Sequence, residues 1–332
     1  FMLAIWAVIF VISIWVLVKS ADYFTDYSEK LGKILKLPNF IVGVLIVAIG
    51  TSLPELATSV AGVSKGEAEF LSGNVLGTVI VNILLGLSLA VVLTKKKARF
   101  SWDIVSNDLP FFAGAIFLVA ISLMDGRFTT MEAVIFLIGY IIYVIYAYNI
   151  QKTAKENEKE KYQKELKSEI KSETEYIETV KKKKDIKKII PFLLVSLLVV
   201  AVSSHYVVEA VIHIADILGL GTSIMAATAV ALGTSLPEIF VAVSAARRGN
   251  FDLVIGDIIG SNIFDIFVIY GAVGLFTELT ITRELFIILI SFLIGSFVLM
   301  WLTFIDKKLT KAEGWMFVLL YIMFVGKLFN IF

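Results

Sequence analysis

The 332-residue sequence contains no cysteine and only two histidines. The absence of cysteine excludes disulfide bonds and metal sites built on thiolates. Charge is also scarce, because only 18% of the residues are charged and 58% are hydrophobic. This composition excludes a water-soluble globular protein, since a domain of this size cannot bury so much apolar surface. With a net charge of only +1, nothing in the overall charge suggests nucleic-acid binding.

Long apolar runs recur along nearly the whole chain. A helix needs about 20 consecutive apolar residues to cross the hydrocarbon core of a lipid bilayer. The sequence therefore predicts an all-α polytopic membrane protein with ten transmembrane helices. The predicted spans begin near residues 2, 40, 70, 104, 129, 189, 222, 252, 283 and 314.

Basic residues are distributed unevenly between the loops that join these spans. The loops after spans 1, 3, 7 and 9 hold 13 Lys and Arg residues, whereas the loops after spans 2, 4, 6 and 8 hold only Lys65, Arg127 and Arg283. Basic residues accumulate on the cytoplasmic side of a membrane. We therefore expect a multi-pass protein of the cell membrane with the odd-numbered loops in the cytoplasm and both termini outside.

A charged segment divides the chain into two halves. Residues 151–188 carry 13 lysines and 9 acidic residues, and they separate an N-terminal half, 1–150, from a C-terminal half, 189–332. We interpret this segment as a solvated, partly helical cytoplasmic linker, because mixed charge runs of this kind are typical of solvent-exposed structure. A regulatory helix on the membrane surface is the alternative interpretation.

The two halves contain an internal repeat. Residues 48–55, AIGTSLPE, recur 183 positions later as ALGTSLPE, and the same shift aligns GNVLGT at 73–78 with GDIIGS at 256–261. The repeats cover about 40–94 and 222–275. Because five predicted spans separate the copies, the second copy crosses the membrane in the opposite direction. Inverted repeats of five helices are typical of secondary transporters, which bind their substrate where the repeats meet near the midplane.

Each repeat places a glutamate directly after a proline inside an apolar span. A carboxylate at this depth is costly unless it is neutralised, and no Lys or Arg is predicted at the same depth as Glu55 and Glu238. Pro54 and Pro237 remove backbone hydrogen bonds and interrupt their helices. Interrupted helices persist in a membrane where the freed groups line a polar cavity. The natural partner of these glutamates is a cation.

Other oxygen-bearing side chains surround each glutamate at helical spacing. Hydroxyl groups lie three and four positions before each glutamate, and a polar stripe with spacing i, i+4, i+8 follows in the next span. The stripes are Asn74, Thr78 and Asn82 in the first repeat and Asp257, Ser261 and Asp265 in the second. The glycine pairs Gly73/Gly77 and Gly256/Gly260 have the spacing that lets helices approach closely. Oxygen ligands without thiolate or imidazole favour hard cations such as Ca²⁺ and Na⁺, and several carboxylates favour a divalent ion.

The paired GTSLPE blocks, followed by GN-x-x-G-T and GD-x-x-G-S-N, resemble the alpha repeats of the sodium/calcium exchangers in the cation/Ca²⁺ antiporter superfamily. The resemblance implies a ten-helix antiporter in which spans 1 and 6 slide across spans 2, 3, 7 and 8. It also implies that Glu55 and Glu238 form a central Ca²⁺ site with Na⁺ sites around it. The implied ligands are Ala48, Thr51, Ser52, Glu55, Thr78, Asn82, Ala231, Thr234, Ser235, Glu238, Ser261 and Asp265, with the two alanines acting through their carbonyls.

One departure from the family pattern affects the expected ion coupling. Asp257 stands where the second repeat commonly has asparagine, and whether it or Asn74 reaches the cavity is left open by the sequence. An additional carboxylate would change the stoichiometry or the counter-ion. We therefore expect Ca²⁺/Na⁺ exchange by alternating access, with Ca²⁺/H⁺ exchange, K⁺-dependent exchange and a passive cation channel as alternatives. We expect no enzymatic activity, no cofactor and no obligate protein partner.

Overall fold

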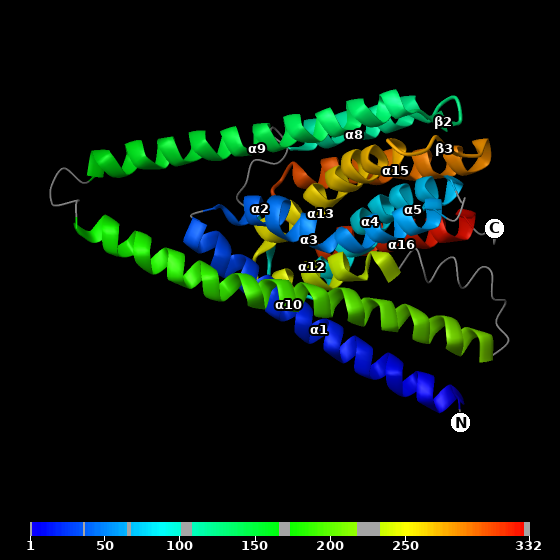
Figure 1. The fold of residues 1–332 in the computed structure, drawn as a ribbon, viewed down its shortest axis with the longest axis horizontal. Helices are drawn as coiled ribbons and strands as arrows, with labels where there is room; N and C mark the ends of the chain where they lie inside the picture. The colour runs from blue at the N-terminus through cyan, green and yellow to red at the C-terminus, as the bar shows by residue number, and fades with distance from the viewer. Residues whose placement is uncertain are drawn as a thin grey trace.

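The computed structural model describes residues 2–35, 37–64, 68–100, 108–165, 173–217 and 233–328. The described chain is helical apart from two short two-stranded ribbons (Figure 1). The first half contains α1 (Met2–Leu35), α2 (Asn39–Val42), η1 (Gly43–Val47), α3 (Ala48–Thr51), α4 (Leu53–Ser64), α5 (Ala68–Val81), η2 (Asn82–Gly86), α6 (Leu87–Val92), β1 (Ala98–Arg99), α8 (Leu109–Ser122), β2 (Arg127–Phe128) and α9 (Thr130–Glu165). The second half contains α10 (Glu173–Ile217), α12 (Leu236–Arg248), α13 (Phe251–Phe264), η3 (Asp265–Ile269), α14 (Tyr270–Gly274), β3 (Leu279–Thr280), α15 (Arg283–Phe304), β4 (Lys308–Leu309) and α16 (Lys311–Leu328).

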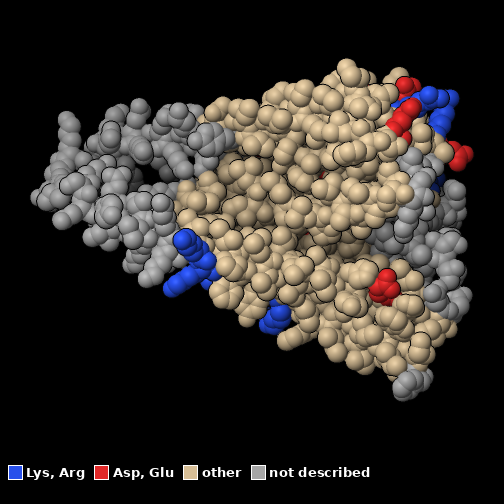
Figure 2. All heavy atoms as spheres, in the orientation of Figure 1, with Lys and Arg blue, Asp and Glu red and all other residues tan. Residues whose placement is uncertain are grey.

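Seven helical stretches of the described residues are long and apolar enough to cross a membrane. They are Met2–Leu35, Asn39–Ser64, Leu71–Val92, Thr130–Ala147, Ile186–Ile214, Phe251–Gly274 and Arg283–Phe304. Leu109–Ser122 is apolar but shorter, and α16 carries three charged residues. The predicted span that begins near residue 222 starts outside the described residues. On the face in Figure 2, charged side chains are few and lie mostly toward the edges, as a surface in contact with lipid requires.

The spans form an inner and an outer set. Within the most apolar window of each span, 94% of residues are buried in Phe251–Gly274 and 83% in Leu71–Val92. The corresponding value is only 11% for α1 and 22% for Ile186–Ile214 of α10. The inner spans are the ones that carry the repeated motifs, whereas α1 and α10 pack against each other at the periphery (Figure 1). Polar residues on the inner spans are therefore shielded from lipid.

Helix α1 is longer than the sequence predicted. The sequence placed Lys19, Lys30 and Lys33 in a loop after the first span, but the structure places all three on α1. At 1.5 Å per residue, its 34 residues extend for about 51 Å, well beyond a bilayer core of about 30 Å. The prediction was wrong because a helix that extends beyond the membrane carries charged residues, and its sequence pattern is then the same as that of a loop.

The charged linker is helical over most of its length. Helix α9 continues to Glu165 and α10 begins at Glu173, so both helices extend from the membrane spans into the segment predicted as partly helical. These extensions project from the end of the molecule opposite to β2 and β3 (Figure 1). Helix α1 begins, and α16 ends, at the end that carries β2 and β3.

The two ribbons each join the first half of the chain to the second. Strand β1 pairs with β4, with Ala98 opposite Leu309 and Arg99 opposite Lys308. Strand β2 pairs with β3, with Arg127 opposite Thr280. The ribbons lie at opposite ends of α15, which at 22 residues is about 33 Å long. Backbone pairing thus ties the two halves together at both ends of the bundle.

Candidate ion-binding site

Both repeats interrupt their helices at the same position. Helix α3 ends at Thr51, Ser52 follows with φ −80° and ψ 0°, and α4 begins at Leu53. In the second half, Ser235 has φ −82° and ψ −2°, and α12 begins at Leu236. These serines stand just before the prolines that the sequence identified as helix breakers. Each break places a glutamate in the first turn of the following helix, where the helix dipole favours negative charge.

Four carboxylates are buried on α4, α12, α13 and η3. Glu55, Glu238, Asp257 and Asp265 are all at most 2% exposed. Both carboxylate oxygens of each residue lack a hydrogen-bond partner among the described residues. Burying an ionised carboxylate without a partner is costly, so such groups bind a cation or a proton. Asp257 is fully buried, and whether it reaches the ion cavity stays a prediction.

The four carboxylates are electrostatic neighbours. Glu55 lies close enough to Glu238 and Asp265 to interact with both, and Asp257 interacts with Glu238 and Asp265. One of these carboxylates follows each break, Glu55 on α4 and Glu238 on α12, and the other two lie on α13 and η3. The like charges repel one another, so the cluster is stable in an ionised form only when positive charge is bound among them.

Hydroxyl groups of each half lie beside carboxylates of the other half. Thr51 is next to Glu238 and Asp257, and Thr234 is next to Glu55. Ser52 is next to Asp265, and its own hydroxyl is buried without a hydrogen-bond partner among the described residues. The two helix breaks therefore meet, and each places hydroxyl groups beside carboxylates of the other half.

The inner spans also contain matching π-helical turns. Turn η2 begins at Asn82 and η3 begins at Asp265, which are equivalent positions of the repeat. Single π-helical turns within α-helices are frequent at functional sites, because they turn one side chain out of helical register. The amide of Asn82 donates a hydrogen bond of 3.2 Å to the side-chain oxygen of Asn262, and both residues are fully buried.

Asn262 is a site neighbour that the sequence prediction missed. The equivalent position in the first repeat is Val79, so a search for duplicated polar residues passes over it. The sequence signal that could have identified Asn262 is its polar amide, directly after the predicted ligand Ser261 in an otherwise apolar helix. Ser59 was missed for the same reason, because its counterpart is Ala242. The hydroxyl of Ser59 accepts a hydrogen bond of 3.1 Å from Asn74, which leaves the carbonyl oxygen of Asn74 without a partner among the described residues.

The remaining predicted ligands are buried in the same spans. Thr78 is fully buried, and its hydroxyl has no partner among the described residues. Ser261 donates to the carbonyl of Ile258 at 3.2 Å, and Thr51 donates to that of Val47 at 3.1 Å, so both hydroxyls keep their lone pairs available. Ala48 and Ser235 are also fully buried. Ala231 lies outside the described residues.

The glycine pair of the second repeat permits close helix packing. A Cβ added at Gly256 would lie 2.1 Å from the carbonyl oxygen of Phe40, and one added at Gly260 would lie 2.7 Å from the Cα of Val44. Only glycine fits where the backbones approach this closely. The prediction is confirmed for this pair. Gly77 of the first repeat does not make such a close contact, because none of the described residues places an atom within 4 Å of a Cβ added there.

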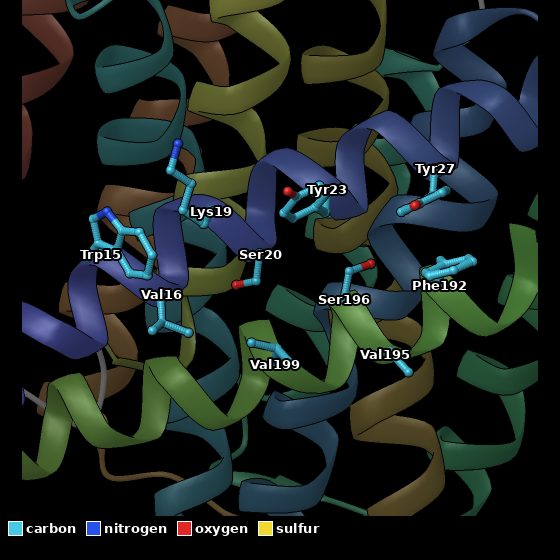
Figure 3. A pocket seen from close by; sticks show the side chains of 10 residues that line it. All are labelled: Trp15, Val16, Lys19, Ser20, Tyr23, Tyr27, Phe192, Val195, Ser196 and Val199. Atoms are coloured by element: carbon cyan, nitrogen blue, oxygen red, sulfur yellow. The ribbon is translucent and has the colours of Figure 1, made fainter.

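The acidic side chains do not make a metal site by themselves. Among the described residues, no three acidic or histidine side chains converge closely enough to hold a metal ion by themselves. Hydroxyl, amide and backbone oxygens must therefore complete any coordination shell. A groove of about 670 Å³ between α1 and α10, lined by residues such as Trp15, Tyr23 and Phe192, is separate, because none of the predicted ligands lines it (Figure 3).

Comparisons with known proteins agree with this architecture. The chain matches the family described as sodium/calcium exchanger protein over residues 5–149 and 188–329. It is 30% identical to the sodium/calcium exchanger MaX1 of Methanosarcina acetivorans over 95% of this chain and 96% of that protein. It is 26% identical to the inner membrane protein YrbG of Escherichia coli over 80% of this chain and 78% of the relative.

A solved structure shares the fold along almost the whole chain. The sodium-calcium exchanger NCX_Mj, in crystals soaked with 10 mM Na⁺ and 10 mM Sr²⁺, is 27% identical, with a TM-score of 0.78. The match covers 97% of each chain. Sequence, fold and family comparison lead to one assignment: this chain is a membrane protein of the sodium/calcium exchanger family.

Proposed function

We propose that this protein exchanges Ca²⁺ for Na⁺ across the membrane and that the buried carboxylates bind both ions. The observation that carries this proposal is the set of four lipid-shielded carboxylates, all without hydrogen-bond partners among the described residues. Among the described residues, the side chains that act on them are other carboxylates and hydroxyls, not basic groups. A cation is the partner that such a cluster lacks.

The proposed ligand set draws on both repeats. Glu55 and Glu238 form the central Ca²⁺ site, and hydroxyl, amide and carbonyl oxygens complete a shell of about 6–8 oxygens, as Ca²⁺ requires. Na⁺ sites share these carboxylates, so that the two ions compete. The further proposed ligands are Ala48, Thr51, Ser52, Thr78, Asn82, Ala231, Thr234, Ser235, Ser261 and Asp265, with Asn74 and Asp257 as additional candidates.

Exchange follows from the cost of moving bare carboxylates through a medium of low dielectric constant. Only a site neutralised by bound cations can pass between its two open states, so release of one ion requires binding of the other. The peripheral pair α1 and α10 is the element proposed to slide, because it packs mainly on itself and is largely exposed on its outer side. With an inward Na⁺ gradient, the cycle extrudes Ca²⁺.

The same proposal includes the topology of the chain. We infer ten spans in two inverted five-helix repeats, with both termini outside and the 151–188 linker in the cytoplasm. The excess of basic residues in the odd-numbered loops supports this orientation. The position of the linker helices, at the end opposite to the start of α1 and the end of α16, supports it as well (Figure 1).

Flux measurements in proteoliposomes test the function and separate its alternatives. Na⁺, K⁺ and pH gradients are imposed one at a time while Ca²⁺ uptake is measured. We expect internal Na⁺ to drive uptake without K⁺ or a pH gradient. Uptake that follows only the pH gradient identifies Ca²⁺/H⁺ exchange, and uptake that needs K⁺ identifies K⁺-dependent exchange. A Ca²⁺ current that persists without any counter-ion would identify a passive channel.

A further inference from the structure

A pocket of about 320 Å³ lies at one end of the bundle, and none of the buried carboxylates lines it. It is formed by the segment that follows α6 and by the turn between α15 and α16, which the β1–β4 ribbon holds together. Val91 and Leu309 supply apolar walls. Ala98 and Thr310 also line it, and the other six lining residues are basic: Lys95, Lys96, Lys97, Arg99, Lys308 and Lys311.

The ribbon places two of these positive charges directly opposite each other. Arg99 pairs with Lys308 in the strand register, and both side chains are exposed, whereas the neighbouring pair of Ala98 and Leu309 is buried. Like charges directly opposite each other destabilise an antiparallel pair. An anion bound beside the two side chains would relieve this repulsion.

Few acidic groups compensate this charge. Lys308 lies 3.5 Å from the carboxylate of Asp306. The nearby Glu313 accepts hydrogen bonds through Oε2 from the backbone N–H and the hydroxyl of Thr310 at 2.6 and 2.8 Å, so it caps α16 and adds one negative charge near the pocket. The other five basic side chains of the lining form no ion pair with any carboxylate in the part of the chain that the structure describes.

The second ribbon shows that the fold does not require this arrangement. The β2–β3 ribbon lies at the other end of α15 (Figure 1). There, Arg127 lies opposite the neutral Thr280 and forms an ion pair with Glu278 at 3.6 Å. A general excess of basic residues on the cytoplasmic side accounts for their number. It does not account for their convergence on one pocket or for an opposed Arg–Lys pair.

We propose that this pocket binds the phosphate of an anionic membrane lipid. Guanidinium and ammonium groups are the usual phosphate ligands, and basic pockets at the cytoplasmic ends of membrane helices bind anionic headgroups. Exposed apolar side chains precede each strand outside the pocket lining, with Leu93 54% exposed five positions before β1 and Ile305 58% exposed three positions before β4. A phosphate in the pocket with acyl chains against these side chains matches both features, which favours a lipid over a soluble phosphate.

Lipid binding by the purified protein tests this proposal without any transport measurement. Native mass spectrometry of the detergent-solubilised protein compares retention of phosphatidylglycerol with that of phosphatidylcholine. Arg99→Gln lowers phosphatidylglycerol binding about fivefold, or about 1 kcal/mol, which is the contribution of one basic residue near an anionic surface. The triple variant Lys97→Gln/Arg99→Gln/Lys311→Gln loses it almost completely. Size-exclusion chromatography checks that each variant is folded.

Matched controls separate this pocket from general surface charge. Arg127→Gln, at the other ribbon, leaves phosphatidylglycerol binding at the wild-type level, and Lys97→Arg/Lys311→Arg retains it. Equal binding of phosphatidylglycerol by the Arg99→Gln variant and the wild type would overturn the proposal, as would equal binding of phosphatidylcholine by the wild type. If inorganic phosphate competes with phosphatidylglycerol at equal concentration, the pocket binds a soluble phosphate and the assignment to lipid is wrong.

Discussion

The side-chain amide of Asn82 donates a hydrogen bond of 3.2 Å to the side-chain oxygen of Asn262, across 180 positions of the chain. The bond joins η2 of the first half to α13 of the second, next to the π-helical turn that begins at Asp265. It therefore fixes the orientation of a proposed ligand from one half by means of a residue from the other half.

Replacing Asn262 should destabilise the protein and weaken ion binding. Asn262→Ala leaves the amide of Asn82 without its acceptor, at a cost of about 1 kcal/mol for a hydrogen bond between membrane helices. We expect a lower thermal unfolding temperature in detergent and weaker protection of the protein by Ca²⁺. Ser296→Ala is the matched control, because that hydroxyl bonds only to the carbonyl of Leu293 in its own helix. Equal effects of the two changes would contradict the role given to Asn262.

The close approach of α13 to the first half predicts contrasting effects of two glycine substitutions. Gly256→Ala places a methyl group 2.1 Å from the carbonyl oxygen of Phe40, so the backbones must separate. Overpacking of this kind costs about 1–3 kcal/mol. Gly77→Ala meets no described atom within 4 Å and should be neutral or slightly stabilising, because alanine is the better helix former. Thermal unfolding of both variants compares them, and a destabilised Gly77→Ala with an unaffected Gly256→Ala would reverse the assignment.

A polar network holds the end of α1 against α12 and α13. Arg248 donates to the backbone carbonyl of Asp22 at 2.6 Å and to the carboxylate of Asp26 at 3.2 Å. Ser244 donates to the carboxylate of Asp22 at 2.6 Å, and Asn250 donates to that of Glu29 at 2.7 Å. A partly exposed ion pair such as that of Arg248 and Asp26 contributes only about 0.2–1 kcal/mol, so we expect the network to add modest stability to the contact of α1 with α12 and the start of α13.

Arg248→Gln should therefore loosen α1 without unfolding the protein. We expect faster amide hydrogen exchange over residues 22–35 and a change in thermal stability below about 1 kcal/mol. Arg127→Gln, which removes an ion pair at the other end of the bundle, should leave exchange in this segment unchanged. Unaltered exchange at the end of α1 in the Arg248→Gln variant would show that the network does not hold this helix.

Asp257 should influence how much charge moves in each cycle. Asp257→Asn keeps an oxygen ligand of the same size and removes one negative charge from the buried cluster. The cluster then needs one positive charge less to be neutral. We expect folding to be preserved and the current per transported Ca²⁺ to change, measured in proteoliposomes on a supported membrane. An identical ratio of charge to Ca²⁺ in both proteins would exclude Asp257 from the translocated charge.

Much of the candidate site could be predicted from the sequence because its motifs occur once in each half of the chain. The repeated Ser–Leu–Pro–Glu segment predicts both helix breaks, and Ser52 and Ser235 indeed share one backbone conformation. Features without a duplicate were not predictable in this way. Asn262 has Val79 as its counterpart, so its hydrogen bond to Asn82 depends on how the two halves pack.

The limits of α1 show a different reason for failure. Lysines on a helix that leaves the membrane have the same sequence signature as lysines in a loop, because both face water. The spacing of Gly256 and Gly260 predicted that another helix approaches closely there, but it could not identify Phe40 as the neighbour of Gly256. Tertiary contacts between distant segments are the information that hydrophobic periodicity lacks.

The most direct test of the central claim is Na⁺-driven Ca²⁺ uptake by proteoliposomes that contain the wild type, Glu55→Gln or Glu238→Gln. Each change removes one buried charge with almost no change in volume, and Glu278→Gln at the exposed β2–β3 ribbon is the matched control. We predict that both buried changes abolish uptake and that the control retains it. Uptake at the wild-type rate in both Glu55→Gln and Glu238→Gln would contradict the account.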